Sequence, residues 1–277
     1  MVVESLVRHR LTAWVLVLTT QALVLMTGCG RSAPAASQSG TAVVIFIDFS
    51  ASVTGEDRAS FRREIEAEIL PSLSAGDRLL IAPIHDKTLT DFRPLVDTSL
   101  PARPHFNGFL DNVLKFNRSA KELDAQILLL KDKTRTEVAN VFAKRFASKY
   151  TDIFSSLLLA QKLFYDETRR KVLILMSDMI EDSPPYNFEK VSWSPATTEK
   201  TLSELDAKGL IPKLAGVCIY VSGASAASAE LAENIGRFWQ AYFQRAGADM
   251  DPSRYAHVLL HWPPASSCHP TSTARTS

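Results

Sequence analysis

The chain has 277 residues and is nearly neutral, with 31 Lys and Arg against 30 Asp and Glu. Hydrophobic residues make up 46% of it, which excludes a mostly disordered protein because this much apolar surface offsets the entropy lost on ordering. The balanced charge argues against a nucleic acid as the main partner. Its 3 cysteines are too few for a disulfide scaffold or a four-cysteine zinc site.

The N-terminal segment has the features of an export signal. A basic start over residues 8–10 precedes an apolar run over 11–26, which is shorter than the about 20 residues of a membrane-spanning helix. The run ends in the sequence LMTGC, which resembles the lipobox of bacterial lipoproteins and places the lipidated cysteine at Cys29. The resemblance implies cleavage before Cys29 and a lipid-anchored protein of the bacterial cell envelope. An ordinary signal peptide followed by a coincidental cysteine is the alternative.

Residues after Cys29 are rich in Ser, Ala, Pro and Gln, a composition that predicts a flexible tether. Gly30 stands where lipoproteins retained at the inner membrane of enteric-type bacteria have aspartate, so the outer membrane or periplasm is favoured. The predicted organisation is a signal peptide over 1–28, a lipidated Cys29 and tether over 29–40, one domain over 41–262 and a disordered tail over 263–277.

Six segments of the domain have the composition of strands. Four are continuous apolar runs rich in β-branched residues, which is typical of strands buried on both faces of a parallel sheet. Another contains Pro94, which lacks an N–H donor and therefore favours an edge of the sheet. The six predicted strands are Thr41–Asp48, Arg78–His85, Leu89–Val96, Lys171–Ser177, Leu214–Val221 and Tyr255–Leu260.

Amphipathic segments separate these strands, and apolar residues at spacings of three and four predict one buried stripe on each. A helical insertion is expected at about 97–150. Within it, Ser119 and Glu122 have the spacing of a capping box, and the polar stretch 131–137 predicts a kink or a break. The predicted helices are Glu56–Leu70, Ser119–Tyr150, Asp152–Tyr165, Thr198–Lys208 and Ala226–Ala246.

The alternation of strands and helices predicts a doubly wound α/β fold. We expect three layers, with helices on both faces of a Rossmann-like, mostly parallel six-stranded sheet that has one antiparallel edge strand. In such sheets ligands bind at the carboxyl ends of the strands, where the strand order reverses. Side chains that follow the strands are therefore the first candidates for a functional site.

Carboxylates and hydroxyls gather at these positions. Asp48, Ser50 and Ser52 alternate at the end of the first strand, Asp178 follows a later apolar strand, and Thr151 precedes a helix. The pattern resembles the metal-ion-dependent adhesion site of the von Willebrand factor A family, also called integrin I-like. In that family an Asp-x-Ser-x-Ser motif, a later Thr and a later Asp hold a metal ion. The resemblance covers the domain by element order as well as motif, and implies that these five residues are metal ligands.

The five side chains suit a hard divalent cation. Mg²⁺ prefers about six oxygen ligands and keeps some waters, and three hydroxyls with two carboxylates can fill most of that shell. The carboxylates formally neutralise the ion, while the weakly donating hydroxyls leave it electrophilic. We therefore expect Mg²⁺, or Mn²⁺, and an unidentified protein partner that offers an Asp or Glu to the metal.

The expected function is divalent-metal-dependent protein–protein interaction or adhesion by an exported, lipid-anchored domain, without enzymatic activity. Helix capping and turn formation are the structural alternative for Asp48, Ser50 and Ser52, because Asp and Ser favour both. A metal-assisted hydrolase that uses the same acidic site and a metal-free envelope scaffold protein are the functional alternatives. The chain departs from the family at Met179, where a Gly is common.

Several other residues receive structural interpretations. Glu181 and Asp182 are expected in a solvated acidic loop, and Trp193, in a Pro-rich loop, is a candidate surface residue. Cys218 lies in an apolar strand and is expected to be a small buried hydrophobe. A disulfide between Cys218 and Cys268 is the alternative outside the cytoplasm.

Overall fold

The computed structural model describes residues 40–85, 89–90, 92–104, 108, 113–144, 146, 148 and 150–264. The predicted signal peptide, Cys29, nearly all of the predicted tether and Cys268 lie outside the described residues. Within the described part of the chain, no helix is both long enough and apolar enough to cross a membrane.

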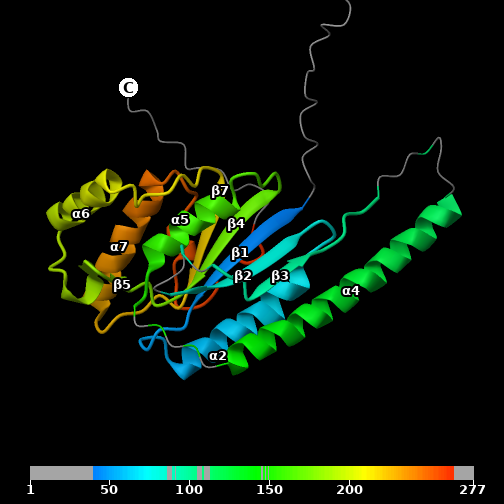
Figure 1. The fold of residues 1–277 in the computed structure, drawn as a ribbon, viewed down its shortest axis with the longest axis horizontal. Helices are drawn as coiled ribbons and strands as arrows, with labels where there is room; N and C mark the ends of the chain where they lie inside the picture. The colour runs from blue at the N-terminus through cyan, green and yellow to red at the C-terminus, as the bar shows by residue number, and fades with distance from the viewer. Residues whose placement is uncertain are drawn as a thin grey trace, which may run out of the picture. The chain divides into compact units, whose positions relative to one another are not determined.

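The central sheet contains five strands: β1 (Thr41–Asp48), β2 (Arg78–Ile84), β3 (Val96–Ser99), β4 (Arg170–Met176) and β7 (Val217–Ser222). Their order is β3–β2–β1–β4–β7 (Figure 1). Parallel pairing joins β1 to β2, β1 to β4 and β4 to β7, whereas β3 runs antiparallel to β2 at one edge. This arrangement confirms the mostly parallel sheet with one antiparallel edge strand.

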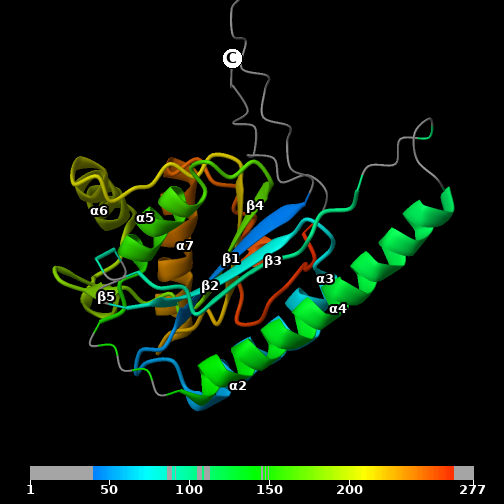
Figure 2. The same ribbon diagram turned by 45° about the vertical axis from the view of Figure 1, so that its right-hand side comes forward.

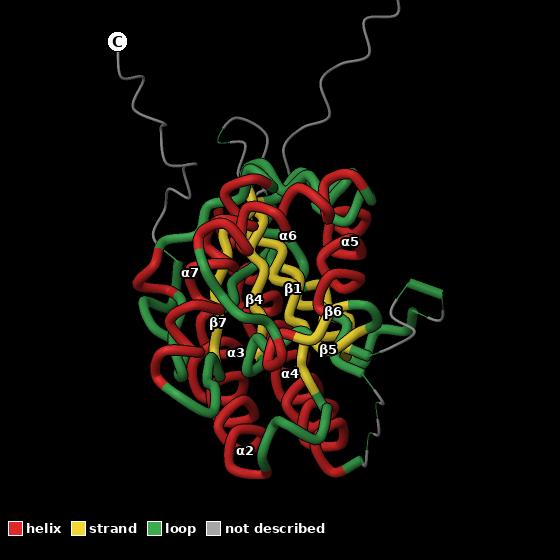
Figure 3. The backbone as a smooth tube through the Cα atoms, turned by 90° about the vertical axis from the view of Figure 1, so that its left-hand side faces the viewer, coloured by secondary structure: helices red, strands yellow, loops and turns green. Residues whose placement is uncertain are grey.

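Helices cover both faces of the sheet. One face carries α5 (Ile153–Leu163), α6 (Pro195–Ala207) and α7 (Ala229–Arg245), which we call the α5–α7 layer. The other carries α2 (Gly55–Glu64), a π-helical turn η1 (Ile65–Ile69), α3 (Leu70–Ser72) and α4 (Val113–Ala143), which we call the α2–α4 layer. The two layers lie on opposite sides of the strands (Figures 1, 2 and 3). The protein is therefore a three-layer, doubly wound α/β fold, consistent with a von Willebrand factor A-like architecture.

Burial on both faces explains the continuous apolar runs. Along β1, Val44 and Phe46 face the α5–α7 layer, whereas Val43 and Ile45 face the α2–α4 layer, as the two-residue period of a strand requires. Both hydrophobic clusters are therefore built from the same strands.

Two predicted strands differ from the structure. The edge strand covers Val96–Ser99 rather than Leu89–Val96, so Pro94 precedes it. The sixth strand, predicted over Tyr255–Leu260, is wrong: Tyr255 makes an isolated parallel bridge to Val221. Beyond that bridge, the N–H of Leu259 donates to the buried carboxylate of Glu64 at 3.1 Å instead of a strand carbonyl. The sheet therefore has five strands among the described residues.

The helix predictions need three corrections. α4 begins at Val113, so Ser119 and Glu122 lie inside the helix and do not cap it. The predicted break over 131–137 is also wrong, because α4 is continuous and the hydroxyl of Thr134 donates to the carbonyl of Leu130 within it at 2.8 Å. The helix predicted over Glu56–Leu70 widens into η1 and continues as α3.

The remaining elements are short. They are the two-stranded β5 (Asp182–Ser183) and β6 (Tyr186–Asn187), with the 3₁₀ turns η2 (Phe188–Lys190) and η3 (Pro252–Arg254). Cys218 is fully buried on β7, as predicted, and it is disulfide-bonded.

Candidate metal centre

The strand order reverses between β1 and β4, because the chain places β2 on one side of β1 and then returns to place β4 on the other. Asp48 is the last residue of β1, and Asp178 follows the end of β4. The two carboxylates therefore stand at the carboxyl ends of neighbouring parallel strands, where sheets of this kind bind ligands.

Asp48 is fully buried, and its two carboxylate oxygens accept separate hydrogen bonds. The N–H of Ser50 donates to Oδ1 at 2.8 Å, and the hydroxyl of Ser177 donates to Oδ2 at 2.9 Å. Burial raises the pKa of Asp48, and the bonds from Ser50 and Ser177 and the charge of Arg58 oppose this rise. The carboxylate is thus fixed in position before any ligand arrives.

Asp178 is 6% exposed, and its Oδ1 accepts the N–H of Ile180 at 2.9 Å. Burial and then the negative charge of Asp48 raise the pKa of Asp178 to about 6, while hydrogen bonds from Ser52 and Ile180 act against them. Two carboxylates that share one site repel each other, and a bound cation would remove that repulsion. The two buried carboxylates and the neighbouring hydroxyls of Ser50 and Ser52 are oxygen donors that could hold a metal ion.

The two motif serines connect the carboxylates. The hydroxyls of Ser50 and Ser52 are 2.9 Å apart. Ser50 also hydrogen-bonds to Asp48 through its side chain, and the side chain of Ser52 hydrogen-bonds to Asp178. The structure therefore brings Asp48, Ser50, Ser52 and Asp178 into one hydrogen-bonded group, and the exposure of Ser52 leaves the group accessible from solvent.

Thr151 reaches this region through its backbone. It is buried just before α5 and forms an isolated antiparallel bridge with Asp182, with N–O distances of 3.2 and 3.0 Å. Asp152 is the N-cap of α5 and accepts the N–H of Ser155 at 2.9 Å. None of the hydrogen bonds between described residues joins the Thr151 hydroxyl to Asp48 or Asp178.

Arg58 is a contributor that sequence reasoning missed. It lies on α2, and its Nη2 donates to the carbonyls of Phe49 at 3.0 Å and Ser50 at 2.7 Å. It therefore braces the loop that carries the serines. The one signal in the sequence is its place in the first turns of a helix that Thr54 caps by accepting the N–H of Asp57.

Glu181 contradicts the prediction of a solvated acidic loop, because its side chain is fully buried. Its Oε2 accepts the N–H groups of Ile153 at 2.8 Å and Phe154 at 3.3 Å, and its other oxygen contacts the hydroxyl of Ser183. Burial raises the pKa of Glu181 well above its ordinary value. The helix end explains the position, since its first N–H groups lack partners within the helix.

Met179 connects the loop to α7. Its backbone has a φ of 66°, in the left-handed region that glycine occupies freely, at the position where the family commonly has Gly. The indole N–H of Trp239 on α7 donates to the carbonyl of Met179 at 2.8 Å. The unusual conformation is thus held by a buried tryptophan.

The donor set consists of hard oxygen ligands, which suits Mg²⁺ or Mn²⁺. The described part of the chain holds no group of three or more His, Cys, Asp or Glu side chains placed for a metal ion. The candidate centre instead combines two carboxylates with hydroxyls.

No protein-family model matches this chain, and no curated protein sequence matches it. Among solved structures, the manganese-loaded TRAP protein of Plasmodium vivax matches 73% of this chain with 12% sequence identity and a TM-score of 0.35. The chain spans 64% of the length of that solved chain. At this TM-score the match adds nothing to the fold assignment, which rests on strand order and layering.

Proposed function

We propose that this chain is an exported, lipid-anchored domain of the von Willebrand factor A type that binds a protein partner through Mg²⁺ or Mn²⁺. The observation that carries the proposal is the pair of buried carboxylates, Asp48 and Asp178, at the ends of adjacent parallel strands. Burial and then the charge of Asp48 make ionisation of Asp178 less favourable, and a divalent cation would stabilise both ionised groups.

The proposed ligands are Asp48, Ser50, Ser52, Thr151 and Asp178. When bound, the cation supplies an electrophilic position that a carboxylate from a partner Asp or Glu can occupy. The chain's own side chains would then hold the metal at the carboxyl ends of β1 and β4. The exposed loop around Ser52 gives the partner access.

Binding is proposed rather than catalysis. The described hydrogen-bond partners of Asp48 and Asp178 are serine hydroxyls and backbone N–H groups. A hydrolase would need a general base within hydrogen-bond reach of the reacting water. The arrangement therefore favours a site that completes its metal shell with a partner's carboxylate.

A metal titration tests the proposal. Adding Mg²⁺ or Mn²⁺ to the purified, metal-free domain should raise the melting temperature, because a ligand that binds only the folded state stabilises it. Asp48→Ala should abolish the shift, whereas the matched Asp132→Ala variant, at an exposed position of α4, should retain it. The absence of a shift in the wild-type protein would refute the metal site.

Partner capture separates adhesion from a metal-free scaffold role. Envelope extracts of the source organism, passed over the immobilised domain with Mg²⁺, should yield a protein that EDTA releases and that Asp48→Ala does not retain. Capture that survives EDTA would instead support the scaffold alternative.

The lipid anchor is proposed from the LMTGC sequence at Cys29, with the outer membrane or periplasm as its location and the signal peptide cleaved before Cys29. Cell fractionation tests it directly. The wild-type protein should sediment with membranes, and Cys29→Ser should release it to the soluble fraction. Unchanged retention of the variant would rule out anchoring through this residue.

A further inference from the structure

We propose that Glu181 is a positioning residue that holds the Thr151 segment against the Asp178 loop, an inference that rests on the proposed metal site. Glu181 follows Asp178 on the same loop, and its side chain is fully buried. Its Oε2 accepts the N–H of Ile153 at 2.8 Å and that of Phe154 at 3.3 Å. One carboxylate oxygen thus joins the loop after β4 to the start of α5.

A second connection joins the same two segments. Thr151 and Asp182 exchange backbone hydrogen bonds of 3.2 and 3.0 Å. Because Ile153 is only two residues from Thr151, fixing its N–H also restricts where the Thr151 backbone can lie. The Glu181 side chain and the backbone bridge therefore act together as a clamp.

The clamp matters because Thr151 has no direct bond to the other candidate ligands. Asp48, Ser50, Ser52 and Asp178 hold one another through side-chain hydrogen bonds. The hydrogen bonds between described residues give Thr151 no such link. Its distance from the carboxylates is set by the clamp, so loss of Glu181 would displace one ligand while leaving the other four in place.

The same helix end offers a matched control. Asp152 also caps α5, but its side chain accepts the N–H of Ser155 at 2.9 Å within the helix start and is not part of the clamp. Asp152→Ala therefore removes a capping bond without releasing the Asp178 loop. A purely structural role for Glu181 predicts that the two losses have similar consequences, whereas a positioning role predicts that only the loss of Glu181 weakens metal binding.

The test is Mn²⁺ binding to the purified domain, measured from the electron paramagnetic resonance signal of free Mn²⁺, with circular dichroism to confirm folding. Glu181→Ala should weaken Mn²⁺ binding roughly tenfold, the lower end of the effect seen when residues that orient metal ligands are removed. Glu181→Gln should restore affinity close to that of the wild type, since its amide oxygen can accept the same N–H groups. Asp152→Ala should also bind close to wild type.

A double-mutant cycle shows whether Glu181 acts through Thr151. Thr151→Val removes the hydroxyl with little change in shape. If the clamp serves that hydroxyl, the double variant should bind about as weakly as Thr151→Val alone, because the two changes remove one interaction. If the double variant instead loses Mn²⁺ affinity by the product of the two single losses, the inference is overturned.

The outcomes distinguish the inference from the function on which it rests. Wild-type protein that does not bind Mn²⁺ refutes both. Wild-type protein that binds Mn²⁺ while Glu181→Ala binds equally well refutes the positioning role alone, and equal losses in Glu181→Ala and Asp152→Ala do the same. If Glu181→Ala does not fold, Glu181→Asp replaces it, because the shorter side chain keeps the carboxyl group but falls short of the N–H groups. The same outcomes then decide between the two roles.

Discussion

The two helical layers differ in how they connect to the candidate metal centre. The α5–α7 layer reaches the loop after β4 through polar bonds: Trp239 donates to Met179, and Glu181 accepts from the start of α5. In the α2–α4 layer, Arg58 on α2 is the matching connection, and it reaches the loop after β1. The first layer thus contacts the loop that carries Asp178, and the second contacts the loop that follows Asp48.

The layers also differ in their cores. The α5–α7 layer contains a group of contacting aromatic rings. Trp193, predicted as a surface residue, is partly buried and packs against this group, with its ring centroid 4.9 Å from that of Phe188. The ring contacts involve Phe154, Tyr186, Phe188, Trp193, Phe238, Trp239, Tyr242 and Phe243.

By contrast, the buried side chains of α4 lie from its middle to its C-terminal end, at Ile127, Thr134, Val138 and Val141. Its outward leucines are exposed, Leu128 by 63% and Leu129 by 70%. The sheet is therefore covered on one side by fully packed helices and on the other partly by a long helix that is anchored at one end. We expect substitutions in the two layers to have very different effects on stability.

One pair of identical substitutions tests this contrast most strongly. Leu157 on α5 is fully buried, whereas Leu129 on α4 is 70% exposed. Leu157→Ala should lower the free energy of unfolding by about 2–5 kcal/mol, because it removes apolar contacts and leaves a cavity. Leu129→Ala should change it by less than about 0.5 kcal/mol, as is usual at exposed positions. Urea denaturation measures both, and similar values would break the comparison between the layers.

The pH dependence of the stability of the metal-free protein tests whether the pKa of Asp178 is raised in the folded state. Its pKa rises from 3.8 to about 6 in the folded state, so the folded protein binds this proton more tightly than the unfolded chain. Ionisation therefore destabilises the fold: the effect is absent below about pH 4, grows as the pH rises through 6 and is complete above it, at up to roughly 3 kcal/mol.

Asp178→Asn removes that contribution while its amide oxygen can still accept the N–H of Ile180. In EDTA, the variant should gain stability relative to the wild-type protein as the pH rises from 5 to about 7.5. Urea denaturation at both pH values gives the difference. An unchanged difference between the two proteins would show that the pKa of Asp178 is not raised in the folded protein. Mg²⁺ should reduce the difference if the cation occupies the site.

A pair of tryptophan substitutions compares one indole hydrogen bond on each side of the sheet. Trp239→Phe removes the N–H that reaches Met179 and leaves a buried carbonyl without its partner, which should cost about 1–3 kcal/mol. Trp262 is half-buried on the α2–α4 side, and its N–H donates to the hydroxyl of Ser72 at 3.0 Å. Trp262→Phe should cost less, about 0.5–1.5 kcal/mol, because water can replace the lost bond. The reverse order in urea denaturation would contradict the stronger coupling of α7 to the loop.

The sequence predicts the parts of the fold that follow from local burial. The strands β1, β2, β4 and β7 are buried on both faces, so their apolar runs are long and continuous. The segment Tyr255–Leu260 is also apolar, but Glu64, far away in the chain, takes the N–H of Leu259. Periodicity does not reveal such a side-chain acceptor, and the sixth strand was therefore predicted wrongly.

The candidate site likewise contains residues that the sequence could place and residues that depend on tertiary contacts. Asp48 and Asp178 could be placed together from the sequence because parallel strands bring their carboxyl ends to one edge of the sheet. Glu181 could not, since an acidic residue in a loop has the same local sequence whether it is solvated or buried against a helix start. Its role depends on α5 lying beside the loop, which is a tertiary contact.

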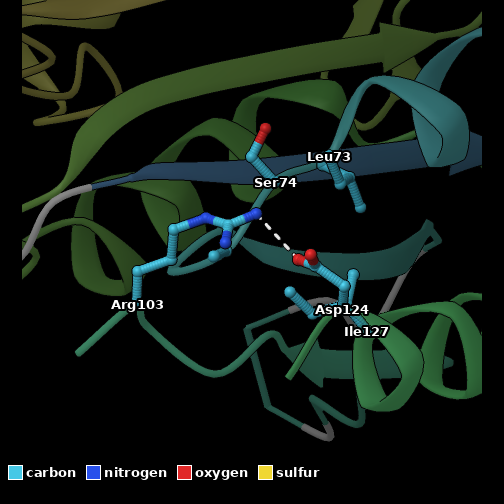
Figure 4. Close-up of a pocket in the computed structure, with 6 residues that line it drawn as sticks. Leu73, Ser74, Arg103, Asp124 and Ile127 are labelled. Carbon is cyan, nitrogen blue, oxygen red and sulfur yellow. Dashed lines mark hydrogen bonds and ion pairs between the residues drawn. The ribbon is translucent and has the colours of Figure 1, made fainter. Parts of the chain in front are cut away.

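The smallest predicted effect concerns the ion pair at the free half of α4. Arg103 and Asp124 are 2.7 Å apart, with side chains 59% and 53% exposed. They line a cavity of about 400 Å³ together with Leu73, Ser74, Ala75 and Ile127 (Figure 4). Arg103→Ala should lower the unfolding free energy by about 0.5 kcal/mol or less, because exposed ion pairs gain little over solvation.

Urea denaturation at low and high salt measures this effect, which salt should reduce further. A loss above about 1 kcal/mol would exceed what exposed pairs contribute. It would mean that this pair anchors the first half of α4, where none of the described side chains is buried ahead of Ile127. The α4 helix would then be anchored by an ion pair in its first half and by apolar side chains beyond it. Its contrast with the aromatic α5–α7 layer would lie in the kind of contact rather than in the extent of anchoring.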